Sequence, residues 1–397
     1  MKVALAHDFL IKWGGAEKVL FDLHEIFPEA PIYTLFYNKK FTDEYFPNTK
    51  IEISHLQRKY RLLKRNYRWL LPWMPMAVEA LDFSDYDLVV SSSSAFLKGI
   101  IVPTKNKHIC YMHTPTRWAW QDYFSQKRNF FKRLYAHFYR IWDFDAAQRP
   151  DIIIANSEYT ARRIKKYYKG EAEVVYPGVE LENIKHQVTN KYEIRNTKYE
   201  TIPKSKYSKF KTENIYQIPY KKYFIVVSRL SAYKKIDLII EAFKDLSFNL
   251  VIVGDGAEQH KLKIKSEKLK INDRVFFTGF IKDKAIIARL VENSIALIHL
   301  TEEDFGICMA EALALGKPVI GFKKGGAREI IKRGHNGELI DGKNNEEIIN
   351  NLKNAVKKLA LNKKKYIINI TKQNKGMFLK KNFIKEILNL VKATVNT

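Results

Sequence analysis

The amino-acid sequence predicts an α/β protein in which two doubly wound domains face a cleft. Short apolar runs that end in polar residues recur in both halves of the 397-residue chain, and helix-length stretches separate them. Such runs are typical of buried strands in a parallel sheet. Between the two series, residues 183–217 are rich in Lys, Asn, Thr and Tyr and lack apolar periodicity. We expect this stretch to be a basic surface insertion or linker.

The first series begins at the amino terminus. Residues 2–6 form an apolar run, Gly14 and Gly15 then indicate a turn, and residues 16–26 have the apolar spacing of a helix. Further strands of this half are predicted at residues 86–91, 108–112 and 151–155.

The second series starts at Tyr223, where the alternation of apolar runs and helical stretches resumes. Its predicted strands have the sequences YFIVVS, NLVIVG, RVFFTG, SIALIHL and KPVIGF. In open sheets of this kind, ligands bind at the carboxyl ends of the strands. We assign residues 1–182 to a first domain, 183–217 to the insertion, 218–370 to a second domain, and 371–397 to a C-terminal helix that can cross back to the first domain.

The charge of the chain indicates the chemistry of its partners. Lys and Arg number 69 and Asp and Glu number 43, so the formal net charge is +26. This excess favours a nucleic acid, an anionic lipid surface or a phosphorylated small molecule, although a Lys-rich genome explains part of it. A hydrophobic fraction of 46% excludes a disordered chain, and no apolar run approaches the roughly 20 residues of a spanning helix. The two cysteines, Cys110 and Cys308, make neither a disulfide framework nor a metal cluster, which favours the reducing cytoplasm.

Two stretches of the first half, residues 55–76 and 127–142, interleave Arg and Lys with Trp, Tyr, Phe and Leu. A basic amphipathic helix with aromatic residues is typical of a helix that lies on a membrane surface. The same composition lines grooves that bind single-stranded nucleic acid. A third interpretation is a helix that packs its apolar stripe on the sheet and leaves a basic face in solvent. The presence of two such stretches in one domain favours a surface contact.

The segment over residues 301–322 carries the sharpest pattern. It follows a predicted strand and opens a helix near Gly306, where free backbone N–H groups and the helix dipole favour a phosphate. Glu303 lies in the loop and Glu311 inside the helix. The first carboxylate could face a reacting sugar, and the second could accept hydrogen bonds from ribose hydroxyls. Alternatively, both glutamates cap the helix and face solvent.

Two cations follow the first strand of the second half. Arg229 and Lys234 lie just before a predicted helix, with Lys235 as a neighbouring candidate. A pair of cations at the carboxyl end of a strand suits a diphosphate and would stabilise charge that develops on a leaving group.

Three other segments carry weaker signals. Gly14 and Gly15 could bring backbone N–H groups against a phosphate or a sugar, although a lone Gly-Gly pair is more often a turn. His113 follows a strand, where it could bond a substrate hydroxyl or serve as a structural histidine. Gly325 and Gly326 again follow a strand, just before a short helix.

Together these segments resemble family 4 of the retaining glycosyltransferases, which have the two-domain GT-B fold. EDFGICMAE with ALALGKPVIG resembles the family's block of two glutamates separated by seven residues, and SRLSAYKKIDLIIEAF resembles its arginine–lysine diphosphate block. VIVGDGAEQHKL with VFFTGFI is similar to the strand pair that flanks the nucleotide base. GGAEKVL, HTPTRWAW and ANSEYTARRIKKYY with VVYPGV extend the likeness through the first half. The combination most resembles bacterial mannosyltransferase-type members that build surface polysaccharide of the O-antigen kind.

The resemblance implies a role for individual side chains. Arg229 and Lys234 would hold the donor diphosphate and neutralise the departing nucleotide. Glu303 would contact the donor sugar near its reacting carbon, and His113 would bond the sugar from the opposite domain. These four residues form the expected catalytic set, and Glu311 would bond the ribose hydroxyls. The expected donor-binding set comprises Gly14, Gly15, Phe280, Ile281, Phe305, Gly306, Ile307, Glu311 and Gly326.

The function that the resemblance implies is transfer of a hexose, mannose from GDP-mannose, to a lipid-linked or polysaccharide acceptor. It implies no cofactor and no metal, because cationic side chains replace the metal, and a peripheral position on the inner face of the cytoplasmic membrane. A UDP-sugar is an alternative donor within the same fold. A different class, a basic nucleic-acid-binding protein, leaves Glu303 and Glu311 unexplained, so no specific nucleic acid is expected. The intact set of charged residues also disfavours a GT-B scaffold that has lost catalysis.

Overall fold

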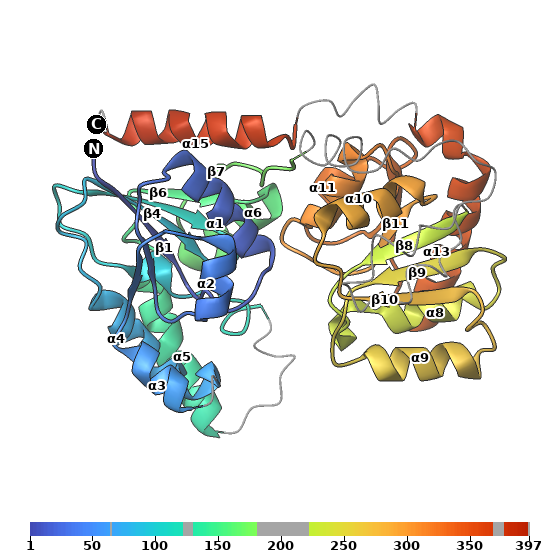
Figure 1. Ribbon diagram of the computed structural model, residues 1–397, viewed down its shortest axis with the longest axis horizontal. Coiled ribbons are helices and arrows are strands. Elements are labelled where there is room, and N and C mark those ends of the chain that lie inside the picture. Colours follow the sequence, from blue (N-terminus) through green and yellow to red (C-terminus); the bar gives the residue numbers. More distant parts are fainter. Residues whose placement is uncertain (64–65, 122–129, 181–221, 368–376, 396–397) are drawn as a thin grey trace. The chain divides into compact units, whose positions relative to one another are not determined.

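The computed structural model divides into two compact units, each built on one parallel sheet with helices on its faces (Figure 1). The first unit comprises Met1–Gly178 and Lys380–Thr397, and the second comprises Val179–Leu379. The expected insertion, residues 183–217, lies outside the described residues. The structure describes residues 1–63, 66–121, 130–180, 222–367 and 377–395.

The sheet of the first unit confirms the doubly wound topology. Its parallel strands are, in spatial order, β3 (Ile51–Ile53), β2 (Ile32–Thr34), β1 (Val3–His7), β4 (Leu88–Ser93), β5 (Lys107–Met112), β6 (Ile152–Ala155) and β7 (Glu173–Val174). The strand order reverses between β1 and β4, which is the kind of switch point where such sheets bind ligands. The sequence pattern revealed β1, β4, β5 and β6, whereas the short strands β2, β3 and β7 bury too few residues to show a period.

Helices cover the faces of this first sheet. The C-terminal helix α15 (Lys380–Val395) packs Phe383, Ile387 and Val391 into one core with Val19 and Leu23 of α1 (Gly15–Ile26), so it belongs to the first unit. The remaining helices are α2 (Lys39–Tyr45), α3 (Leu56–Leu62), η1 (Tyr67–Trp73), α4 (Met74–Glu79), η2 (Leu97–Gly99), α5 (Phe130–Ala146) and α6 (Glu158–Tyr168).

The second unit repeats this topology. Its parallel strands are, in spatial order, β10 (Val275–Gly279), β9 (Asn249–Val253), β8 (Tyr223–Val227), β11 (Leu297–His299), β12 (Val319–Phe322) and β13 (Gly337–Ile340). The apolar runs predicted from Tyr223 onward are β8 to β12, and the order reverses between β8 and β11. Its helices are η5 (Ala232–Lys234), α8 (Ile236–Phe243), α9 (Gln259–Lys268), α10 (Lys284–Asn293), α11 (Ile307–Ala314), α12 (Ala327–Ile330) and α13 (Asn345–Leu361).

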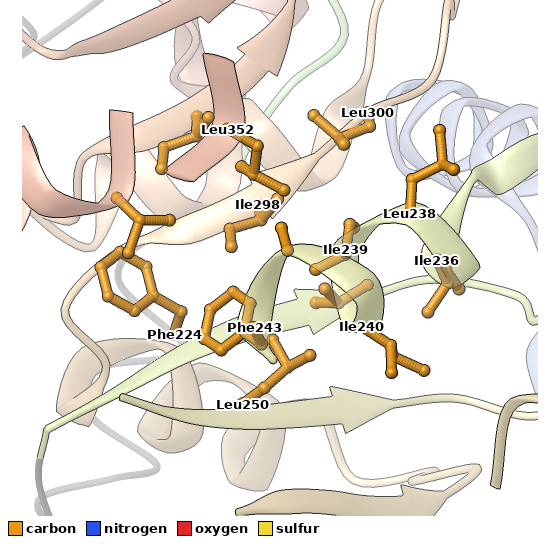
Figure 2. Packing of buried hydrophobic residues seen from close by; sticks show 14 of the residues in the cluster. Phe224, Ile236, Leu238, Ile239, Ile240, Phe243, Leu250, Ile298, Leu300 and Leu352 are labelled. Atoms are coloured by element: carbon orange, nitrogen blue, oxygen red, sulfur yellow. The ribbon is translucent and has the colours of Figure 1, made fainter. Parts of the chain in front are cut away.

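The core of the second unit forms where α8 covers the sheet (Figure 2). Ile240 and Phe243 of α8 lie beside Phe224 of β8 and Leu250 of β9, and the two phenylalanine rings meet edge to face at 5.9 Å. Burial of these side chains is the main force that holds α8 on the sheet. It also fixes the loop between β8 and α8, which carries the two predicted cations.

The chain passes between the units at Gly178–Val179 and again at Leu379–Lys380. Val179 pairs with Leu379 in an isolated parallel bridge, and its N–H donates to Phe378 O at 2.7 Å. The boundaries predicted from the sequence fall after residues 182 and 370 instead. This pairing joins segments about 200 residues apart in the chain and leaves no apolar period that would reveal it.

Candidate functional site

Loops that follow neighbouring strands of the second unit carry most of the predicted charged residues. Arg229 and Lys234 follow β8, Glu303 follows β11, and Gly325 and Gly326 follow β12. Because β8, β11 and β12 are neighbours in a parallel sheet, these loops leave the sheet at the same edge. The structure therefore groups residues that are far apart in the sequence.

Lys234 and Glu303 form an ion pair at this edge. Lys234 ends the short helix η5 and is only 8% exposed. Its Nζ contacts Glu303 Oε1, which supplies the counter-charge that a buried ammonium needs. The two loops assigned by resemblance to the diphosphate and to the donor sugar are thus joined directly.

His299, the last residue of β11, lies against the same carboxylate. Its Nε2 is 3.4 Å from Glu303 Oε1. Burial alone would raise the pKa of Glu303, but His299 and Lys234 outweigh burial and hold that pKa well below its usual range. Burial alone would lower the pKa of His299, but Cys308 and Glu303 outweigh it and raise that pKa to about 10. At neutral pH the cluster is therefore a carboxylate between two cations. His299 was not among the residues predicted for the site, and its place at the end of a strand is its one signal in the sequence.

The glycines after β12 hold the Glu303 loop in place. Gly325 has a φ of 64°, and a Cβ there would collide with the carbonyl oxygen of Glu303. Gly326 donates its N–H to that oxygen at 2.9 Å, and a Cβ on it would lie 2.5 Å from Phe305 O. A larger residue at either position would push the Glu303 loop aside. The expected contact of Gly326 with a donor sugar stays a prediction.

Gly306 is the N-cap of α11, at the position where the sequence indicates that a helix opens. Its φ of 96° lies in the left-handed region, where glycine is favoured over other residues. Phe305 is buried and its ring lies 5.6 Å from the ring of Phe378, so this side chain anchors the loop within the second unit. A donor would meet Phe305 through its backbone. Ile307 and Glu311 are half-buried on α11.

Three more predicted residues border this edge and differ in exposure. Arg229 is exposed, and its side chain makes no hydrogen bond or ion pair with any other residue that the structure describes. Phe280 and Ile281 follow β10; the Phe280 ring is exposed, whereas Ile281 is buried. Arg229 and Phe280 can therefore reach a ligand with their side chains, and Ile281 can offer its backbone.

In the first unit, His113 follows β5 and carries a neutral imidazole. Its Nε2 lies 2.8 Å from Ser92 Oγ, and Nδ1 of His7 lies 3.1 Å from the same hydroxyl. Burial and then the neighbouring His7 lower the pKa of His113 to about 3. A neutral imidazole that is oriented in this way can exchange a hydrogen bond with a hydroxyl group without itself bearing a charge.

The amino-terminal glycines meet an acidic side chain. Gly14 is the N-cap of α1 and Gly15 its first residue, and Glu17 lies in the first turn. Glu17 Oε1 lies 3.6 Å from His7 Nε2, and a Cβ on Gly14 would meet Glu17 Oε2 at 2.8 Å. The carboxylate already complements the positive end of this helix, so a donor phosphate at Gly14 or Gly15 would have to compete with it.

Asp8 shapes the switch point of the first sheet and was missed as a functional candidate. Its carboxylate accepts hydrogen bonds from the backbone N–H groups of residues 94–97, at distances of 2.6 to 2.9 Å. It also accepts one from Ser93 Oγ at 3.2 Å. Asp8 follows β1 and residues 94–97 follow β4, so one buried side chain ties together the loops on both sides of the switch.

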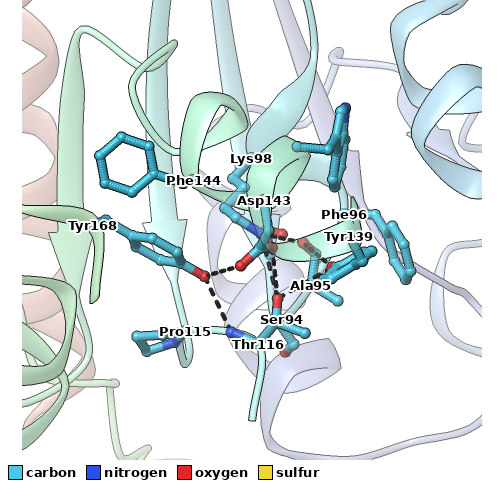
Figure 3. Close-up of polar contacts among 12 residues, drawn as sticks. Ser94, Ala95, Phe96, Lys98, Pro115, Thr116, Tyr139, Asp143, Phe144 and Tyr168 are labelled. Carbon is cyan, nitrogen blue, oxygen red and sulfur yellow. Dashed lines mark hydrogen bonds and ion pairs between the residues drawn. The ribbon is translucent and has the colours of Figure 1, made fainter. Parts of the chain in front are cut away.

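A buried ion pair between Lys98 and Asp143 fixes the loop that follows β5 (Figure 3). Lys98 Nζ lies 2.6 Å from Asp143 Oδ1, and Asp143 is fully buried. The carboxylate also accepts hydrogen bonds from Thr116 Oγ1 at 2.8 Å and from Tyr168 OH and Trp120 Nε1, each at 2.7 Å. Asp143 belongs to α5, so it anchors the loop after His113 to two helices. Neither Lys98 nor Asp143 was among the predicted site residues.

Two family models match the chain, one in each half. Glycosyltransferase Family 4 matches residues 13–183, and Glycosyl transferases group 1 matches residues 209–374. The solved structures similar to this chain over nearly its whole length include glycosyltransferases of the same two-domain architecture. The chain therefore belongs to family 4 of the glycosyltransferases and has the GT-B fold.

Named relatives match over part of their length. N-acetyl-α-D-glucosaminyl L-malate synthase of Bacillus anthracis is 31% identical over 121 residues, which cover 30% of this chain and 31% of that protein. An uncharacterised glycosyltransferase of Methanocaldococcus jannaschii is 26% identical over 220 residues, which cover 55% of this chain and 52% of that protein. The chain thus aligns with about a third and about half of the length of these two relatives. Anabaena HepE, solved in complex with UDP-glucose, is 19% identical with a TM-score of 0.67, over 99% of this chain and 100% of that one.

Proposed function

We propose that this chain transfers a sugar from a nucleotide-sugar donor to an acceptor in the biosynthesis of a cell-surface glycan. The observation that carries this proposal is the cluster of Lys234, Glu303 and His299 at the edge where β8, β11 and β12 end. Glycosyl transfer breaks the bond between the sugar and a nucleoside diphosphate, so negative charge develops on the leaving phosphate. Lys234 and the exposed Arg229 are the cations that would stabilise that charge.

Two further residues, one in each unit, have proposed roles in the same reaction. Ionised Glu303 would face the donor sugar, where positive charge develops at the reacting carbon. The neutral imidazole of His113 would bond a sugar hydroxyl. We propose that Lys234 and Arg229 take the part that a metal ion plays in other transferases. Transfer should therefore proceed at an undiminished rate after the protein has been stripped with a chelator.

For the donor we propose GDP-mannose, because the motifs most resemble those of mannosyltransferase-type members. A UDP-hexose is the second candidate, and it is favoured by the likeness to HepE, whose structure holds UDP-glucose. The backbone around Phe280 and Ile281 is the proposed contact of the base. Backbone groups discriminate guanine from uracil less sharply than side chains do, so the sequence alone leaves both donors open.

Saturation-transfer NMR of the purified chain with GDP-mannose, UDP-glucose, UDP-galactose and ADP-glucose tests this proposal. We expect saturation transfer to GDP-mannose alone, because the base and the sugar should both contribute to binding. Selective transfer to a UDP-hexose would replace GDP-mannose with the second candidate. A lack of transfer to every nucleotide sugar would contradict the proposed function.

We propose further that the acceptor is lipid-linked and that the chain reaches it at an anionic membrane surface. No described helix is long and apolar enough to cross a membrane. However, η1 and α5 expose large apolar side chains: Trp69 is 68% exposed, Phe130 71% and Phe131 76%. Tyr135 OH of α5 donates to Leu71 O of η1 at 2.9 Å, so the exposed side chains lie on two elements that contact each other.

The described parts of the two basic aromatic stretches, residues 55–76 and 127–142, fit two of the three expected interpretations: a packed helix and a membrane-surface helix. They bury Leu70 and Tyr139 in the core of the first unit, as ordinary packed helices do. They also present exposed rings beside exposed cations, which suits a surface of anionic headgroups. We call this surface, with Trp69, Phe130 and Phe131, the basic aromatic face. The exposed cations of these stretches are Arg58, Lys59, Arg61, Arg68, Lys132 and Arg133.

A further inference from the structure

The two cysteines of the chain occupy opposite environments. Cys110 lies in the middle of β5 and is fully buried, and burial raises the pKa of its thiol to about 12. Cys308 is partly exposed and is the second residue of α11. Because buried apolar surroundings make a thiol inert, the chain carries one shielded and one accessible cysteine. Nothing in the proposed transfer uses Cys308.

The sulfur of Cys308 lies against the buried imidazole of His299. Sγ is 3.5 Å from Nδ1, and the ring is only 4% exposed. The other ring nitrogen, Nε2, lies 3.4 Å from Glu303 Oε1 and has no hydrogen bond of good geometry with any described residue. The imidazole thus sits between the thiol and the carboxylate of the donor site. Burial opposes a charge on this ring, but the neighbouring Cys308 and Glu303 raise its pKa to about 10, so at neutral pH an imidazolium lies with Nδ1 against the sulfur.

The start of α11 adds a second source of positive potential. Gly306 is the N-cap of this helix, so Cys308 lies in its first turn, among backbone N–H groups without helical partners. Partly exposed cysteines beside a histidine cation and a helix N-terminus are the ones that react with electrophiles and disulfides. Cys308 combines both features, because its sulfur lies against His299 and the residue belongs to the first turn of α11.

We propose that Cys308 is a modification site: its thiol reacts with small disulfides, and the adduct closes the donor site beside Glu303. In this step the thiol loses its proton and its sulfur attacks one sulfur of the disulfide. A new S–S bond forms at Cys308, the original S–S bond breaks, and the other half leaves as a thiolate that takes up a proton. A small thiol reverses the reaction, so the adduct would act as a redox switch. That the adduct blocks the donor rests on the proposed function; the reactivity of Cys308 does not.

The reactivity can be measured without any enzyme assay. The full chain is incubated with oxidised glutathione near pH 6, and the adduct is located by mass spectrometry of its peptides. We expect Cys308 to react about tenfold or more faster in the folded chain than in the same chain unfolded in guanidinium chloride, where the imidazolium and the helix start are lost. The Cys110→Ser variant should react like the wild type, and Cys308→Ser should not react while folded.

A variant of His299 tests whether its imidazolium causes the reactivity of Cys308. In His299→Gln we expect the folded-state rate of Cys308 to fall about tenfold, because the ring that faces the sulfur is removed. Equal rates in the folded and the unfolded wild type would overturn the proposal, even if this variant failed to fold. So would a folded His299→Gln variant that reacts as fast as the wild type.

Protection of Cys308 by a bound donor distinguishes a failure of the modification site from a failure of the proposed function. If nucleotide sugar binds beside Glu303, GDP-mannose or UDP-glucose should slow the reaction of Cys308, and the glutathione adduct should abolish saturation transfer to that donor. Fast reaction of Cys308 without binding of any donor would refute the proposed function and leave the modification site standing. A donor that binds the adduct as tightly as the free chain would overturn the switch.

Discussion

At the scale of single residues, charges in the candidate site depend on one another. Lys234 is tolerated inside the protein because Glu303 lies beside it, and Glu303 stays ionised because Lys234 and His299 face it. Removal of Glu303 would leave the buried ammonium of Lys234 without its counter-charge, a loss that typically costs about 3–5 kcal/mol in a buried pair, whereas Glu303 is partly exposed and tolerates the loss of Lys234 better. A donor diphosphate that enters this site would find a cation already oriented. Preorganised charge of this kind is the largest contribution that a protein makes to many transfer reactions.

The raised pKa of His299 predicts how the free energy of unfolding depends on pH. Folding raises its pKa from 6.5 to about 10, so the protonated ring stabilises the folded state. This contribution is fully present below pH 6.5 and is lost as the pH rises toward 10. In urea titrations at several pH values, the free energy of unfolding of the wild type should fall over this window. The His299→Gln variant should show a shallower fall, and equal slopes in the two proteins would contradict the assigned charge state.

At the scale of elements, Asp143 holds α5, the loop after β5 and α6 together. Asp143→Asn keeps the shape of the side chain but leaves the buried ammonium of Lys98 without its counter-charge. We expect the free energy of unfolding to fall by about 3–5 kcal/mol. Urea denaturation measures this change. The matched control is Asp145→Asn, an exposed position on the same helix, which should shift stability by less than about 0.5 kcal/mol. Similar stabilities for the two variants would show that the network contributes little.

The proposed contact with a membrane predicts the effect of changes on α5, which carries Phe130 and Phe131 of the basic aromatic face. Replacing both Phe130 and Phe131 by Ser should reduce co-sedimentation with phosphatidylglycerol vesicles several-fold, because exposed rings would no longer enter the headgroup layer. Vesicles of phosphatidylcholine alone should bind the wild type weakly, since they lack the anionic charge. Leu361→Ser, at an 86% exposed position in the second unit, is the control and should bind like the wild type. Unchanged binding of the double variant would remove the membrane proposal.

At the scale of the whole molecule, the fold could be predicted from the sequence because strands buried on both faces leave continuous apolar runs. β1, β4 to β6 and β8 to β12 all lie where such runs indicate them, and both units have the expected doubly wound order. Long-range polar pairs leave no such pattern. Asp143 meets Lys98 across 45 positions, and Asp8 meets the N–H group of Phe96 across 88. Lys234 and Glu303 lie 69 positions apart. Their place in one site could be predicted only because the sequence blocks that contain them resemble those of a known family.

The most direct test of the central claim is calorimetric titration of GDP-mannose and UDP-glucose into the wild type, Lys234→Ala and Lys268→Ala. Lys268 is an exposed lysine at the end of α9 and serves as the control. We expect saturable binding of one donor to the wild type and the control. Binding to Lys234→Ala should be about tenfold or more weaker, as expected for loss of a hydrogen bond to a charged group, with unchanged circular dichroism. Equal affinity in all three proteins, or no binding to any, would contradict a donor site built around Lys234 and Glu303.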